Sequence, residues 1–285
     1  MTKQSLSEKD VQRLLTDPSV ETRAATAAKI AADFDPGALS DKERQMAEEI
    51  FRVMVKDAEV RVREALADNL KENAAVPHDV AKALAGDVDS VALPVLEFSK
   101  VLSDQDLIEI VRSQGPAKQV AIAKRDVVSK DLSGALVDAG NEKAVTTLVA
   151  NEGAEISERS LAKVVDDFGE VEAVQNAMVH RPKLPVAISE RLVTMVSENL
   201  KEELAKRHEI STDMATDLIL QSRERATISL GSLGDESDLE KLIKQLHDNG
   251  RLTPSIITRA LCMGDLSFFE ASLAMLSGTS LANAR

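Results

Sequence analysis

The chain has 285 residues, of which 44% are apolar, and it carries a formal net charge of −13. This composition excludes a disordered chain, and the apolar runs are far shorter than the roughly 18 residues that a membrane-spanning helix needs. The single cysteine excludes an internal disulfide framework and favours a reducing compartment, so we expect a cytoplasmic protein without membrane insertion. We expect no nucleic-acid binding, because an acidic chain lacks the cationic field that displaces counterions from a phosphate backbone.

The composition also favours an all-α fold. There is no Trp or Tyr and there are only six Phe, so the core must consist of Ala, Leu, Val and Ile, which suit closely packed helices. Glycine and proline together number twenty, 12 and 8, too few for the many turns of an all-β chain.

Along the chain, an aliphatic residue followed by Ser, Thr or Pro recurs at intervals of 26 to 42 residues. Ser and Thr accept hydrogen bonds from the free backbone N–H groups at a helix start, and Pro fits the first helical turn. Each such step therefore predicts the start of a helix. The nine steps are Leu6-Ser7, Leu39-Ser40, Val76-Pro77, Leu102-Ser103, Val128-Ser129, Ile156-Ser157, Leu184-Pro185, Ile210-Ser211 and Leu252-Thr253.

A second mark near the middle of each interval predicts a tight turn between two helices. Glycine readily adopts the left-handed conformation that ends a helix, and an acidic residue or Pro suits the start of the next one. The marks are Asp17-Pro18, Asp57, Gly86-Asp87, Gly115-Pro116, Gly140-Asn141, Gly169-Glu170, Asn199, Gly234-Asp235 and Gly264-Asp265. Each interval is thus a pair of helices, and repeated pairs of this length are typical of α-solenoids.

The first two units, "DPSVETRAA" and "DAEVRVREA", share the pattern Asp-x-x-Val-x-x-Arg, which resembles the HEAT repeat. The Asp of each pattern is expected to cap the following helix. We therefore predict an all-α protein, a right-handed α-solenoid of about eight to nine HEAT-like helix pairs. Residues 1–75 would form N-terminal HEAT-like repeats, and residues 76–285 shorter, degenerate ones that continue the same solenoid.

Longer stretches resemble an alphaproteobacterial family of HEAT-like proteins that is labelled only as a domain of unknown function. They are "VALPVLEFSKVLSDQDLIEIV", "LVANEGAEIS", "HRPKLPVAISERLV" and "GRLTPSIITRALCMGDLSFFEASLAMLSG". The resemblance begins at about residue 76 and implies a helical repeat fold, but no activity, substrate or catalytic residue. Members of that family often continue beyond the segment that matches "SLANAR", which implies a truncated chain here.

The sequence predicts no catalytic, cofactor or metal site. The four histidines fall in different units, and no His-Glu-x-x-His or Cys-x-x-Cys pattern occurs. Cys262 lies in "RALCMGD", on what reads as an apolar helical face, so we expect it to be buried rather than to act as a nucleophile.

A recurring cation gives the only candidate binding residues. Arg125, Arg181 and Arg207 each stand three residues before a helix-start aliphatic, and nearby cations accompany them. In one interpretation they offset the negative ends of the preceding helices and bond free carbonyls. In the other they line one exposed edge that receives an acidic peptide, a phosphate or a nucleotide. The accompanying residues are Lys124, His180, Lys183, Lys206 and His208.

The segment "STDMATDLILQSRERATISLGSLG" predicts an unusually long helix. Such a helix either packs in the ordinary way or forms a protruding surface for a partner, with Arg223 and Arg225 pointing outward.

These features favour a non-enzymatic scaffold or adaptor for protein–protein interaction, for which bacterial signalling is one setting, because solenoids present long surfaces to partners. The alternative is a regulatory domain that binds an anionic small molecule or a phosphorylated partner on the arginine-lined edge. An enzyme or a nucleic-acid repair module is disfavoured by the charge and by the missing catalytic residues. We expect an unidentified protein partner and no cofactor.

Overall fold

The computed structural model describes residues 19–281 apart from 36, 38 and 208–211, without the side chains of 198–207, 212, 214 and 215. This part of the chain contains sixteen α-helices and no β-strand, apart from one isolated bridge between Val128 and Ala154. None of the described helices is both long enough and apolar enough to cross a membrane. The predicted all-α class is thus confirmed.

The contacts divide the chain into two compact units, residues 1–157 and 158–285. The boundary predicted near residue 75 lies inside the first unit, in the connection between two of its helices. The helices of the first unit are α2 (Val20–Ala32), α3 (Asp41–Met54), α4 (Val60–Leu70), α5 (His78–Ala85), α6 (Asp89–Phe98), α7 (Asp104–Ser113), α8 (Pro116–Ala123), α9 (Lys130–Ala139) and α10 (Glu142–Ala150).

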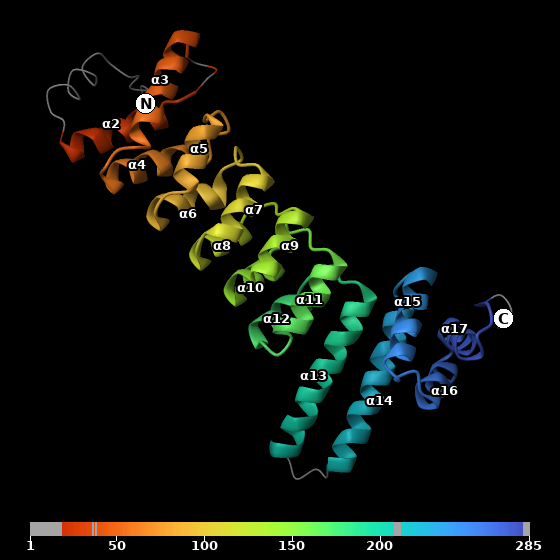
Figure 1. Cartoon of the computed structure of the whole chain (residues 1–285). Helices are drawn as coiled ribbons and strands as arrows, with labels where there is room; N and C mark the ends of the chain where they lie inside the picture. Colours follow the sequence, from red (N-terminus) through yellow and green to blue (C-terminus); the bar gives the residue numbers. More distant parts are fainter. Residues whose placement is uncertain (1–18, 36, 38, 208–211, 282–285) are drawn as a thin grey trace, which may run out of the picture. The chain divides into compact units, whose positions relative to one another are not determined.

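In the first unit, alternate helices pack on one another in chain order (Figure 1). The even-numbered helices from α2 to α10 each contact the next of their row, and α3 contacts α5 as α7 contacts α9. Helices that are consecutive in the chain also contact each other. For example, α5 contacts α6, and α9 contacts α10. Each pair therefore shares its buried surface with the pairs on either side.

The predicted helix starts are confirmed wherever the structure describes them. Helices begin directly after Ser40, Pro77, Ser103, Ser129, Ser157, Pro185 and Thr253. Leu6-Ser7 and Ile210-Ser211 lie outside the described residues. The hydroxyls of the N-cap residues accept from the first-turn backbone, as at Ser129, which accepts from Leu132 N at 3.3 Å.

The described turn marks other than Asn199 fall at boundaries between helices, but not always for the predicted reason, and Asp17-Pro18 lies outside the described residues. Gly140 and Gly264 end their helices in the left-handed conformation, with φ of 71° and 78°. Gly86 has a φ of −83°, so no left-handed backbone is needed there. The expectation that Asp57 caps the next helix is wrong, because Glu59 is the N-cap of α4.

Asp57 instead joins two repeats of the even-numbered row. Nε and Nη2 of Arg23 on α2 donate to its two carboxylate oxygens at 2.8 and 3.1 Å. These hydrogen bonds hold the pKa of Asp57 below its ordinary value. The next repeat has an equivalent pair, in which Nη2 of Arg63 donates to Oδ1 of Asp87 at 2.9 Å. An Arg on α2 and an Arg on α4 are thus each held by an Asp that lies just before the next even-numbered helix.

A buried carboxylate links the odd-numbered helices α5 and α7. Asp106 on α7 lies 2.7 Å from Nε2 of His78 and 3.0 Å from Nζ of Lys82, both on α5, and accepts from the hydroxyl of Ser103 at 2.5 Å. Burial raises the pKa of this carboxyl, but the hydrogen bonds from Ser103, His78 and Lys82 lower it by more. The pKa of Asp106 therefore lies well below its usual range.

The second unit departs from the regular pairing in its middle. Its helices are α11 (Glu158–Phe168), α12 (Glu172–Val179), α13 (Val186–Arg207), α14 (Thr212–Gly231), α15 (Glu236–Asp248), α16 (Pro254–Met263) and α17 (Leu266–Ser277). The turn predicted at Asn199 is wrong, because α13 continues through it as one helix of 22 residues. The predicted long helix is confirmed as α14, of 20 residues, which packs against α13 (Figure 1).

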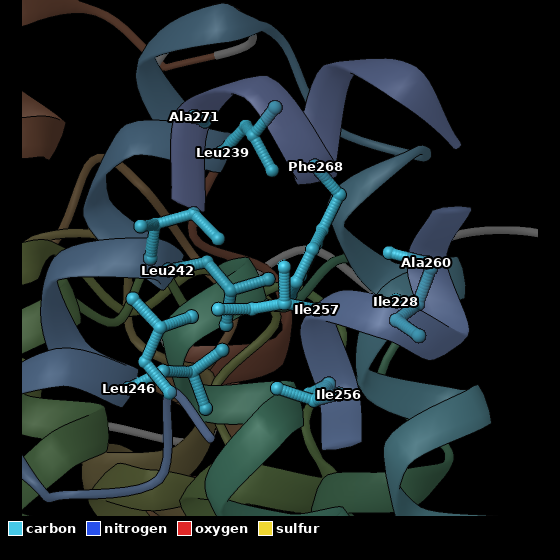
Figure 2. Packing of buried hydrophobic residues seen from close by; sticks show 11 residues of the cluster. Ile228, Leu239, Leu242, Leu246, Ile256, Ile257, Ala260, Phe268 and Ala271 are labelled. Carbon is cyan, nitrogen blue, oxygen red and sulfur yellow. The ribbon is translucent and has the colours of Figure 1, made fainter. Parts of the chain in front are cut away.

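The core of the second unit lies among α14, α15, α16 and α17 (Figure 2). Phe268 on α17 is completely buried there, beside Ile228 and the leucines of α15. Cys262 is not part of this core. The expectation that it is buried is wrong, because Cys262 is exposed near the end of α16. Neighbouring Leu261 and Met263 are exposed as well, so the apolar residues at this end of α16 do not form a buried face.

Candidate functional site

The predicted cationic residues fall in different parts of the structure. Arg125 follows α8 in the first unit, Arg181 follows α12 in the second, and Arg207 is the last residue of α13. The side chain of Arg207 lies outside the described residues, as do those of Lys206 and His208. The proposed common edge of three arginines therefore stays a prediction.

Arg125 has a structural task. Its Nη1 donates to the carbonyl of Leu96 and its Nη2 to that of Ser99, both at 2.6 Å, at the end of α6. The side chain is partly buried, and this burial lowers the pKa of Arg125 from its ordinary value. The guanidinium thus bonds free carbonyls at a helix end, as the first interpretation supposed, but that helix belongs to the preceding repeat rather than to its own.

Asparagines do the same at two other helix ends of the first unit. Nδ2 of Asn151 donates to the carbonyls of Ala123 and Arg125 at 2.9 and 2.7 Å, and Nδ2 of Asn73 donates to that of Phe34 at 2.7 Å. Asn151 follows α10 and reaches the end of α8, and Asn73 follows α4 and reaches the end of α2. Each side chain thus reaches from one even-numbered helix to the even-numbered helix before it. Lys124, next to Arg125, is exposed on this side, with Nζ 4.0 Å from the carboxylate of Glu97.

The connection between α12 and α13, residues 180–185, carries the other candidate residues. Both His180 and Lys183 are exposed, and Arg181 is half-buried. Nδ1 of His180 lies 2.7 Å from the carbonyl oxygen of Asn176 in the last turn of α12. The sequence from 173 to 189 contains no Asp or Glu, so this connection is locally cationic in an acidic chain.

The two ends of this connection border an apolar groove of about 350 Å³, which we call the α13 groove. Val179, 59% exposed, precedes the connection, and Val196, 44% exposed, lies nearly three helical turns into α13. The complete lining is Val179, Leu184, Ser189, Leu192, Val193, Val196 and Ser197. Among the side chains that the structure describes, no charged one lines the groove, while the charged residues of the connection stand beside it.

The local sequence explains why this face of α13 is apolar. The groove-lining residues of α13 lie at offsets of three, four, seven and eight residues from Ser189: Leu192, Val193, Val196 and Ser197. These offsets bring side chains to one face of a helix. The hydroxyl of Ser197 donates back to the carbonyl of Val193 at 2.5 Å, so that it presents little free polarity to the groove.

A buried carboxylate on α13 fixes the helix to the rest of the second unit. Glu190 is fully buried, forms an ion pair with Arg251 and accepts from Nε2 of Gln245 at 3.0 Å. Nη1 of Arg251 also donates to the hydroxyl of Thr194 at 2.7 Å. Sequence reasoning missed this network, because Arg251 lies 61 residues beyond Glu190 and nothing local marks the pair. It holds the groove-bearing turns of α13 in place.

A larger cleft of about 640 Å³ lies along α15 and α17. Its floor includes Ile243 and Ala271, but Glu240 and Lys241 both line it, and Nζ of Lys241 lies 3.5 Å from a carboxylate oxygen of Asp238. With charges of both signs, this cleft gives no indication of what it would bind. The α13 groove is therefore the better candidate site despite its smaller volume.

A family model described as "Uncharacterised protein conserved in bacteria (DUF2336)" matches residues 91–285, and the chain belongs to this family. The match includes the α13 groove and the whole second unit. No curated protein and no solved structure matches the chain.

Proposed function

We propose that this member of an uncharacterised bacterial family is a non-enzymatic scaffold that binds another protein through the α13 groove. The observation that carries the proposal is the groove itself. Aliphatic side chains line it, and two of its valines are about half exposed or more. Apolar surface of this kind is stabilised when a partner covers it.

We further propose that the helix pairs are HEAT-like repeats of a right-handed α-solenoid. The stacking of alternate helices in residues 19–150 supports this, as do the matching ion pairs of Arg23 with Asp57 and of Arg63 with Asp87. Repeats that contact only their neighbours give an elongated surface, which suits the binding of partners. The Glu190–Arg251 pair would hold the groove-bearing helix α13 to the rest of the second unit.

The alternative, an anion-binding edge that includes Arg125, has less support. Two donors of the Arg125 guanidinium already bond carbonyls of the preceding repeat, so an anion would have to compete with them. Lys183 and His180 are exposed and remain candidates. Their place beside an apolar groove favours a polypeptide ligand over a small anion, because the groove adds apolar contact that a phosphate cannot use.

Affinity capture from the native bacterial lysate tests the scaffold function. The full chain, Val196→Asp and the matched variant Val53→Asp would be compared, since Val53 is 72% exposed on α3, outside the groove. We expect the wild type and Val53→Asp to retain the same protein, and Val196→Asp to lose it, because a charge in the groove must be desolvated on binding. Equal capture by all three forms, or capture by none, would contradict the proposal.

A further inference from the structure

We infer that the α13 groove binds an acidic amphipathic helix of the partner protein, with aliphatic side chains in the groove and carboxylates beside Lys183. This inference rests on the proposed function, because it names the chemical class of the partner. The apolar lining, the dimensions of the groove and the charge of the α12–α13 connection each support it.

The dimensions of the groove fit a short stretch of helix. The groove-lining face of α13 includes the nine residues from Ser189 to Ser197, which span about 12 Å at a rise of 1.5 Å per residue. An amphipathic helix that lies along it brings side chains at positions i, i+3 or i+4 and i+7 to one face. The groove volume of about 350 Å³ is at the small end for binding sites, so it accepts a few anchor side chains rather than a globular surface.

The groove is aliphatic, so its partner must supply the larger anchors. The chain has no Trp or Tyr, the residues that most often dominate binding energy at interfaces. Leu, Ile or Phe on the partner would fill the space between Val179 and Val196 and cover both exposed valines. The energy of the complex would then come mainly from apolar area on both sides.

The charge around the groove favours a partner segment with negative charge. Between residues 173 and 189 the formal charge comes from Arg181 and Lys183 alone, with no carboxylate, whereas the whole chain carries −13. Exposed charges interact over about 8 Å at physiological ionic strength, so charges of a bound helix that lie near Lys183 interact with this connection. Carboxylates that border the partner's apolar face would therefore lie favourably beside Lys183, and cations there would be repelled.

Fluorescence anisotropy with three synthetic peptides tests the inference. Each carries leucines at helical i, i+3 and i+7 positions and a fluorescein label, and the flanking residues are Glu, Gln or Lys. We expect the Glu peptide to bind the full chain at least about tenfold more tightly than the Gln peptide, and the Lys peptide to bind most weakly. Raising the salt from about 0.05 to 0.5 M should reduce this preference, because it shortens the screening length.

Two groove variants and two matched controls locate the binding. Val196→Asp and Lys183→Glu should each weaken the Glu peptide about tenfold, whereas Val53→Asp and Lys100→Glu should leave its affinity unchanged. Circular dichroism verifies that all four variants, which replace exposed residues, retain the helical content of the wild type. Equal affinity for the Glu and Gln peptides, or no effect of Val196→Asp, would overturn the inference.

The outcomes separate this inference from the scaffold function. If no peptide binds but the lysate protein is still lost with Val196→Asp, the scaffold stands and the acidic-helix partner is wrong. If phosphatidylglycerol vesicles compete with the Glu peptide and their binding is weakened by Lys183→Glu, the groove binds anionic lipid and the inference is wrong. If neither peptide nor lysate protein binds, both proposals fail.

Discussion

Gly153, in the connection after α10, offers the sharpest test of how adjacent repeats fit together. A Cβ atom on this residue would lie 1.9 Å from the carbonyl oxygen of Asp126, in the connection after α8. Close contacts between carbon and carbonyl oxygen are about 3.3 Å, so Gly153→Ala must separate the two connections by about 1.4 Å. The obstacle is backbone rather than a flexible side chain, and it cannot rotate away.

The energetic effect follows from what this separation breaks. The amide of Val128 donates to the carbonyl of Gly153 at 3.3 Å, and the amide of Glu155 donates to the carbonyl of Val128 at 2.8 Å. Each such bond contributes about 1 kcal/mol net, and overpacking adds about 1–3 kcal/mol. We therefore expect Gly153→Ala to lower the free energy of unfolding of residues 1–157 by about 3–5 kcal/mol.

Urea unfolding followed by far-ultraviolet circular dichroism measures the change, because a chain without Trp or Tyr offers little intrinsic fluorescence. Hydrogen exchange with mass spectrometry locates it, and α8 to α10 should lose protection while α14 to α17 keep theirs. Gly115→Ala is the matched control, because no atom lies within 4 Å of its Cβ position and its φ is −72°. If both variants unfold at the same urea concentration, the close approach of the two connections is refuted.

Three further changes address other contacts. Arg63→Ala should lower stability by about 2–3 kcal/mol, because Arg63 and Asp87 are each only 13% exposed, and a double-mutant cycle with Asp87→Ala should give a coupling of about 1–3 kcal/mol. A coupling near zero would mean that the pair is not formed. The folded pKa of Asp106 lies below its unfolded value of about 3.9, so its stabilisation is complete above that pH and is lost as the pH falls. Asp106→Asn should flatten this part of the stability–pH curve, and an unchanged slope would contradict the network around it. Phe268→Ala should destabilise residues 158–285 by about 3–5 kcal/mol in a urea titration, and a loss below about 1 kcal/mol would show that Phe268 is not buried in the core.

The helix starts were predictable because their chemistry is local. Ser40 and Ser103 cap α3 and α7 with side-chain bonds to residues three positions on, and the acid at that position returns the bond. Such a capping box is contained within four residues of sequence. For the same reason Gly140 could be predicted as a helix end, because its left-handed backbone depends only on the residue itself.

The contacts that hold the repeats together could not be predicted in this way. Arg63 and Asp87 stand 24 residues apart, and Glu190 and Arg251 stand 61 apart. Nothing in a single sequence tells which of 48 carboxylates meets which cation once the chain is folded. The close approach of the two connections at Gly153 could not be predicted either, because the need for glycine comes from a carbonyl 27 residues earlier, at Asp126.

The candidate site combines both cases. The cationic connection could be predicted from its residues, but the α13 groove could not, because the sequence predicted a turn at Asn199 and a second short helix folding back on the first. Such a helix would supply a neighbour for α13 within its own repeat. Instead, α13 continues to Arg207 and packs against α14, the next helix in the chain, and its aliphatic face from Ser189 to Ser197 lines the groove beside the α12–α13 connection. The long helix that the repeat pattern did not predict is therefore also the helix that carries the surface on which we expect a partner to bind.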